Sequence, residues 1–154
     1  MFKIPSRVAV VPLLVFSAAC GGYGDGGSGE AAARFTTART IELQPVAGSG
    51  VRATLTITPP DSASADMAAA AGGQLETALS AEGLDPQFVY PVHLRSGSCG
   101  SDKGVVAQLV SLTPDEDGSA ASSTSVEMAS VAEARSLFAQ ISGPGGDPVA
   151  CGDL

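Results

Sequence analysis

Three cysteines and a single histidine are the residues of this 154-residue chain whose side chains carry the most distinctive chemistry. A thiolate is a nucleophile and a soft metal ligand, and imidazole is the side chain whose ordinary pKa lies closest to neutrality. His93 is therefore the one weak candidate for a metal ligand or a general base, alongside Cys99 and Cys151. Cys20 stands apart from the others because it follows an apolar segment near the start of the chain.

The first 19 residues are arranged like an export signal. Lys3 and Arg7 precede an apolar stretch over 8–16, which is shorter than the roughly 20 residues that a membrane-spanning helix needs. Small residues at 17–19 then lead directly into Cys20. This arrangement predicts a removable signal peptide over 1–19, and hence a protein that is exported from the cytoplasm.

The segment Ser17-Ala18-Ala19-Cys20-Gly21 resembles the lipobox of bacterial lipoproteins, although Ser17 stands where leucine is commonest. The resemblance implies that the Cys20 thiol carries a diacylglycerol, that a fatty acid such as palmitate is added to the new N-terminus, and that these chains anchor the protein to the cell envelope. Gly21 after the cysteine implies the periplasmic side of an outer membrane, if the organism has one. The alternative is an ordinary secretory signal that leaves Cys20 as a free thiol.

Residues 20–37 are expected to form a flexible tether, since six of the eleven residues over 20–30 are glycine. Loss of Lys3 and Arg7 with the signal leaves six basic residues against 16 acidic ones, a net charge of −10. Such an acidic chain cannot neutralise a run of phosphates, which excludes a general nucleic-acid-binding protein. The absence of tryptophan and the single histidine likewise exclude an aromatic stacking platform and a multi-histidine metal site.

Short segments with alternating apolar and polar residues fill the rest of the chain. The segments 38–45 and 51–58 flank Gly48-Ser49-Gly50 and predict a β-hairpin. A mobile connection is expected over 61–73, and then a second pair of strands joined at Gly83-Leu84-Asp85-Pro86. The other expected elements are strands at 74–82, 87–95, 105–112, 122–128, 135–142 and 149–154, and one helical turn with a Ser130 to Glu133 capping box. This pattern predicts an all-β domain over 38–154, an antiparallel Greek-key β-sandwich or flattened barrel.

Two cysteines remain in the exported domain once Cys20 is lipidated. Because compartments outside the cytoplasm are oxidising, this count predicts a disulfide between Cys99 and Cys151, which would fasten the end of the chain. The alternative is a metal site formed by these two thiols with His93, which offers one donor fewer than a tetrahedral structural site needs.

Two segments around these cysteines resemble copper/zinc superoxide dismutases. Residues 92–100 (VHLRSGSCG) are similar to the strand of that family that runs into its disulfide loop, and residues 149–154 (VACGDL) are similar to its closing Ala-Cys-Gly motif. Small exported domains of the chordin (CHRD) type share this appearance. The resemblance covers residues 38–154 and implies a superoxide dismutase-like fold with the two cysteines paired.

Most of the residues that bind metals in that family have no counterpart here. His93 matches the first position of the family's His-x-His pair, but Arg95 stands where the second copper ligand is expected. A guanidinium stays protonated and cannot coordinate a metal ion. The short segment 101–104 also leaves no room for the family's long zinc loop. We therefore expect no cofactor, no catalytic residue and no enzymatic activity, and instead a binding or structural role.

Two alternatives keep a role for His93: a degenerate dismutase that still takes copper or zinc, and a protein that binds or delivers metal. Serine and aspartate abound, so composition permits a Ser-His-Asp arrangement, but no Gly-x-Ser-x-Gly elbow is present. Residues 115–118 (DEDG) are expected to form a solvated acidic turn rather than a calcium site, because they lack the spaced ligands of an EF-hand loop. The membrane, reached through the lipid anchor, is the one partner that the sequence indicates.

Overall fold

The computed structural model describes residues 35–60 and 73–154. The predicted signal peptide, Cys20, most of the predicted tether and the connection over 61–72 lie outside these residues. The described elements, in chain order, are β1 (Arg39–Pro45), β2 (Arg52–Thr58), β3 (Gln74–Glu82), β4 (Tyr90–Ser98), β5 (Ser101–Leu112), β6 (Ala120–Glu127), α3 (Met128–Ala132), β7 (Leu137–Ser142) and β8 (Pro148–Asp153). None of the described helices is long and apolar enough to span a bilayer.

The strands form because apolar residues recur at every second position. In β3, Leu75, Thr77, Leu79 and Ala81 are buried, whereas the residues that alternate with them are exposed. A period of two places all the apolar side chains of a strand on one face of the sheet. These faces meet in one core, whose largest fully buried side chains include Leu43, Leu55, Ile57, Leu75, Leu94, Leu112, Met128 and Ile141.

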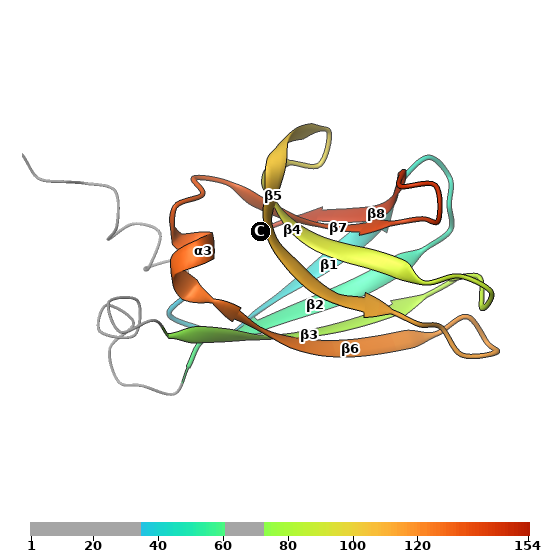
Figure 1. Ribbon diagram of the computed structural model, residues 1–154, viewed down its shortest axis with the longest axis horizontal. Helices are drawn as coiled ribbons and strands as arrows, with labels where there is room; N and C mark the ends of the chain where they lie inside the picture. The colour runs from blue at the N-terminus through green and yellow to red at the C-terminus, as the bar shows by residue number, and fades with distance from the viewer. Residues whose placement is uncertain (1–34, 61–72) are drawn as a thin grey trace, which may run out of the picture.

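One eight-stranded antiparallel sheet, in the order β5-β4-β7-β8-β1-β2-β3-β6, curls into a nearly closed barrel (Figure 1). Its edge strands, β5 and β6, contact each other but share no backbone ladder. Two hydroxyl groups of β6 bridge them instead. The Val110 N–H donates to Thr124 Oγ1 at 2.9 Å, and the Ser122 hydroxyl donates to the Val110 carbonyl oxygen at 3.4 Å. Side-chain hydrogen bonds therefore close this seam of the barrel.

The prediction of an all-β antiparallel domain is confirmed. Around the barrel, β4, β5 and β6 follow one another and β7 returns to lie beside β4, which is the spatial order of a Greek key. Phe35 is 3% exposed and belongs to the core, although it falls within the predicted tether. The packed domain therefore includes a residue that precedes the predicted boundary at 38.

The predicted pairing of segment 74–82 with segment 87–95 is wrong. β3 pairs with β2 and β6, whereas β4 pairs with β5 and β7. The connection from β3 to β4 crosses the end of the barrel instead of forming a hairpin. Leu84 is buried in the core, and its backbone N–H donates to the Gly118 carbonyl oxygen at 3.0 Å. These non-local contacts favour the crossing over a local hairpin.

Two smaller expectations are also corrected. β5 begins at Ser101 rather than at residue 105, because a tight turn after β4 keeps Ser98 opposite Ser101. The expected capping box is not used, since the helical turn begins at Met128 and its N-cap residue, Glu127, makes no side-chain hydrogen bond. Met128 and Val131 are buried at a spacing of one helical turn. Packing rather than capping therefore positions α3.

The β3–β4 crossing packs closely against the β5–β6 turn at Gly118. Its φ is +78°, and a Cβ there would collide with the Leu84 carbonyl oxygen, whereas Gly48 has φ +75° and open space around it. We expect Gly48→Ala to cost about 1–2 kcal/mol of left-handed backbone strain. Gly118→Ala should incur the same strain and cost about 1–3 kcal/mol more, because the backbone at Leu84 must also shift. Urea unfolding measures both variants, and equal losses would contradict the close packing.

Candidate functional site

β4 carries the two sequence-predicted residues His93 and Arg95 on the outer face of the barrel. Leu94, which lies between them, is fully buried in the core, so the alternation of the strand turns both neighbours outward. In the ladder, His93 lies opposite Gln108 of β5 and Gln140 of β7. The imidazole is therefore flanked across both neighbouring strands by amide side chains.

Arg95 is engaged in an ion pair. Its guanidinium binds the carboxylate of Asp102, which lies on the other strand of the β4–β5 hairpin. The hydrogen bond from Arg95, followed by one from the Gly104 N–H at 2.8 Å, holds the pKa of Asp102 below its ordinary value. The pair fastens the end of the hairpin, and it keeps a cation at the position where a second metal ligand would be needed.

His93 stays neutral to lower pH than a free histidine. Partial burial, and then the positive charge of Arg95, lower its pKa. Its Nδ1 is buried and has no hydrogen-bond partner among the described residues. A neutral imidazole can accept a proton or bind a metal ion. Over residues 35–60 and 73–154, however, no group of three or more His, Cys, Asp or Glu side chains is arranged to hold a metal.

The predicted disulfide between Cys99 and Cys151 is confirmed, and the two Cα atoms are 5.9 Å apart. Cys99 follows β4 and Cys151 lies in β8, while β7 is the strand between β4 and β8 in the sheet. The Cys99 N–H also donates to Asp153 Oδ1 at 2.8 Å. The loop after β4 therefore crosses the outer face of β7 to reach β8, where the disulfide and this hydrogen bond hold it.

This crossing accounts for the burial of Phe138. Leu137 and Ala139 belong to the core, so Phe138 lies on the opposite, outer face of β7, yet it is 1% exposed. Its ladder neighbours are Arg95 of β4 and Asp153 of β8, two residues that help to hold the disulfide loop and its hairpin. We infer that the turn after β4, held to β8 by these bonds, covers Phe138 on the outer face of the barrel.

The roles of Phe138 and Asp102 were not foreseen from the sequence. The run Leu137-Phe138-Ala139 is apolar at every position, so its pattern assigns no outer face to Phe138. A signal for the Arg95–Asp102 pair does exist, because a tight hairpin at Cys99 would bring these oppositely charged side chains onto neighbouring strands. That signal depends on recognising that β4 and β5 form one hairpin.

The acidic turn at 115–118 forms as expected. Asp115 Oδ1 accepts hydrogen bonds from the Asp117 N–H at 3.1 Å and from the Ser119 N–H at 2.8 Å. One oxygen of Asp115 is thus used within the turn, whereas Glu116 and Asp117 are exposed. This geometry favours a solvated turn over a calcium site.

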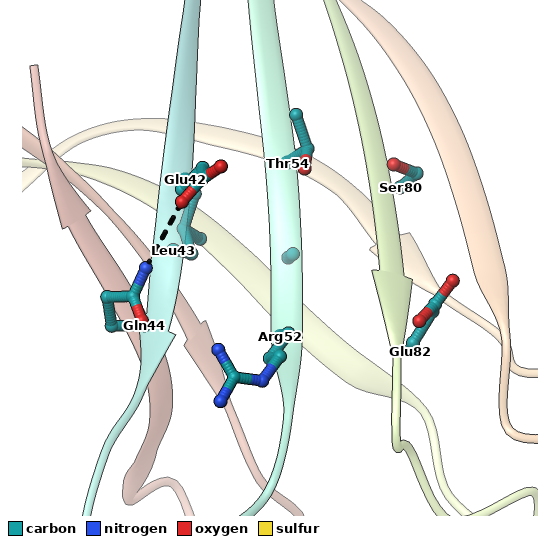
Figure 2. A pocket seen from close by; sticks show the side chains of 8 residues that line it. Glu42, Leu43, Gln44, Arg52, Thr54, Ser80 and Glu82 are labelled. Atoms are coloured by element: carbon teal, nitrogen blue, oxygen red, sulfur yellow. Dashed lines mark hydrogen bonds between the residues drawn. The ribbon is translucent and has the colours of Figure 1, made fainter.

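A shallow hollow of about 250 Å³ lies on the outer face of β1, β2 and β3 (Figure 2). The short side chains of Thr54 and Ser80 lie between longer polar ones. Arg52 leans toward β1 in Figure 2, away from its ladder partner Glu82, and forms no ion pair within the described part of the chain. The other polar lining residues are Glu42 and Gln44, whose side chains are joined by a 3.5 Å hydrogen bond. The hollow can form hydrogen bonds but contains no nucleophile paired with a base.

Comparison of the chain with protein-family models, with curated proteins and with solved structures finds no match. The resemblance to superoxide dismutases or to CHRD-type domains therefore stays a prediction.

Replacing both Cys99 and Cys151 with alanine measures what the disulfide contributes. The bond joins residues 52 positions apart, and the restriction that it imposes on the unfolded chain is worth roughly 4 kcal/mol. We expect the melting temperature to fall by on the order of 10 °C. Cys20→Ser, which leaves the bond intact, is the control and should melt like the wild type. An unchanged melting curve for the double variant would show that the bond does not stabilise the domain.

His93 gives stability a dependence on pH. Because its pKa is lower in the folded state than in the unfolded state, the unfolded chain binds a proton first as the pH falls below about 6.5. The contribution of neutral His93 to the free energy of unfolding is therefore complete at neutral pH and is lost as the medium becomes mildly acidic. We expect the melting temperature of the wild type to fall more than that of His93→Gln between about pH 7.5 and about pH 5.5. Equal decreases would exclude His93 as the titrating group.

Proposed function

We propose that the protein is a lipid-anchored lipoprotein of the cell envelope, and that its β domain binds a partner or has a structural role without catalysing a reaction. The observation that supports this most strongly is the Cys99–Cys151 disulfide. Such bonds persist in oxidising compartments outside the cytoplasm. The bond therefore agrees with the export signal over 1–19 and with lipid attachment at Cys20.

The chemistry of the outer face supports a role in binding. His93 is the one imidazole of the chain, and the neighbouring guanidinium of Arg95 is paired with Asp102. The two cysteines of the domain are joined, so neither thiol is available as a nucleophile or a metal ligand. A metal-binding role would have to recruit further donors to His93 from outside the described residues or from a partner.

A superoxide dismutase-like or CHRD-type origin of the domain belongs to the same proposal. The support for it is that the two segments that carry the resemblance, 92–100 and 149–154, are the segments that the disulfide joins. The Greek-key order of the strands is compatible with this origin. In this interpretation the fold persists without the metal ligands of the dismutases.

Cys20→Ser tests the lipid anchor. The full chain should fractionate with membranes, because two or three acyl chains at about 0.8 kcal/mol per buried CH₂ hold it there. The variant should be exported, folded and released into the soluble fraction. The Cys99→Ala/Cys151→Ala chain is the control and should stay with the membrane. Membrane association of Cys20→Ser equal to that of the wild type would refute the anchor.

A further inference from the structure

All four large hydrophobic side chains that are exposed in the described chain lie on β5 or just before β4. Phe88 and Val89, which are 42% and 54% exposed, occupy the tip of the β3–β4 crossing. Aromatic side chains, phenylalanine among them, are enriched at protein interfaces relative to the rest of the surface. The other two exposed residues, Val105 and Val110, lie along β5.

The tip is held in place by hydrogen bonds. The Phe88 N–H donates to the Asp85 carbonyl oxygen at 3.2 Å, and the Asp85 N–H donates to the Tyr90 hydroxyl at 2.9 Å. The bond from Leu84 to Gly118 ties the tip to the acidic turn of the β5–β6 connection. Because both connections are preorganised, binding at this place would lose little conformational entropy.

Every charged side chain close to Phe88 in the sequence or through these contacts is acidic. Asp85 precedes it, and Asp115, Glu116 and Asp117 lie on the neighbouring turn. No lysine or arginine occurs over 83–94 or 104–134. The surface formed by Asp85, Phe88, Val89 and residues 115–117, here called the Phe88 face, thus combines two exposed apolar side chains with four acidic ones, which are called its acidic rim.

The Phe88 face lies at the end of the barrel opposite to the point where the chain enters β1. β1 and β3 begin at one end, beside α3, whereas the β3–β4 and β5–β6 connections lie at the other (Figure 1). If the lipid anchor of the proposed function precedes β1, the Phe88 face lies at the barrel end remote from the point where the tether joins the domain.

We propose that the Phe88 face binds a cationic segment of another protein, which places apolar side chains against Phe88 and Val89 and lysine or arginine side chains against the acidic rim. A second copy of the chain is disfavoured, because an isologous dimer would bring two acidic rims together. An anionic membrane surface is disfavoured for the same electrostatic reason. The accessibility of this face on the membrane-anchored chain rests on the proposed function, whereas the binding chemistry does not.

The test uses the full chain in phosphatidylcholine nanodiscs and, alongside it, the Cys20→Ser chain in solution. The probe is a short synthetic peptide that interleaves lysine and leucine. One counterpart has glutamate in place of lysine, and the other has serine in place of leucine. Phe88→Gln/Val89→Gln removes the apolar centre, with Val105→Gln as the matched control. Glu116→Gln/Asp117→Asn removes rim charge, with Glu127→Gln as the matched control.

We expect the lysine–leucine peptide to bind both forms of the protein and the two counterparts to bind far more weakly. Phe88→Gln/Val89→Gln should weaken binding about tenfold or more. Glu116→Gln/Asp117→Asn should weaken it about threefold and reduce its dependence on salt. The control variants should bind like the wild type, and thermal melting should confirm that every variant is folded.

Three outcomes would overturn the proposal. The first is binding of the lysine–leucine peptide by the Phe88→Gln/Val89→Gln chain that equals binding by the wild type. The second is concentration-dependent self-association of the wild type that this variant abolishes. The third is binding of the Cys20→Ser chain to phosphatidylglycerol vesicles through Phe88. Binding in solution that disappears in the nanodisc would refute only the accessibility of the face on the anchored chain. Failure of the lipid anchor leaves the measurements on the Cys20→Ser chain unchanged, so the two proposals fail separately.

Discussion

Each strand of this domain must turn one face toward the same interior, and burial of these alternating side chains is the constraint on which the other features depend. It makes the sheet curl until β5 and β6 meet at a seam bridged by the hydroxyls of Ser122 and Thr124. It also draws Leu84 into the core, so that the β3–β4 connection crosses the barrel end. Because apolar side chains fill most of the interior, none of the charged side chains of the described residues is buried.

On the outer face of β4, β7 and β8, the polar groups and the disulfide mainly hold neighbouring strands together. Arg95 holds Asp102 across the β4–β5 hairpin, and the disulfide carries the following loop over Phe138 to β8. His93 lies on the same face, with its pKa lowered by partial burial and by Arg95. This part of the molecule therefore stabilises a shape, whereas the Phe88 face at the barrel end is exposed and available to a partner.

The features that the sequence predicted correctly depend on local pattern or on simple counting. Period-two alternation predicted strands such as β2 and β3, and the cysteine count predicted the pairing of Cys99 with Cys151. The features that it did not predict depend on contacts between distant segments. The hairpin expected at 83–86 gives way to a crossing because of Leu84, and the outward Phe138 is buried by a loop that follows another strand. The local sequence pattern does not predict either contact.

We propose that the outer face of β4, with one imidazole beside an engaged guanidinium, does not support redox catalysis. The most direct measurement is the copper and zinc content of the full chain, purified without chelators from cells supplied with both metals, together with its rate of superoxide consumption. We expect substoichiometric metal and a rate no higher than that of buffer. One tightly held copper ion per chain, with superoxide turnover that His93→Ala abolishes, would contradict it.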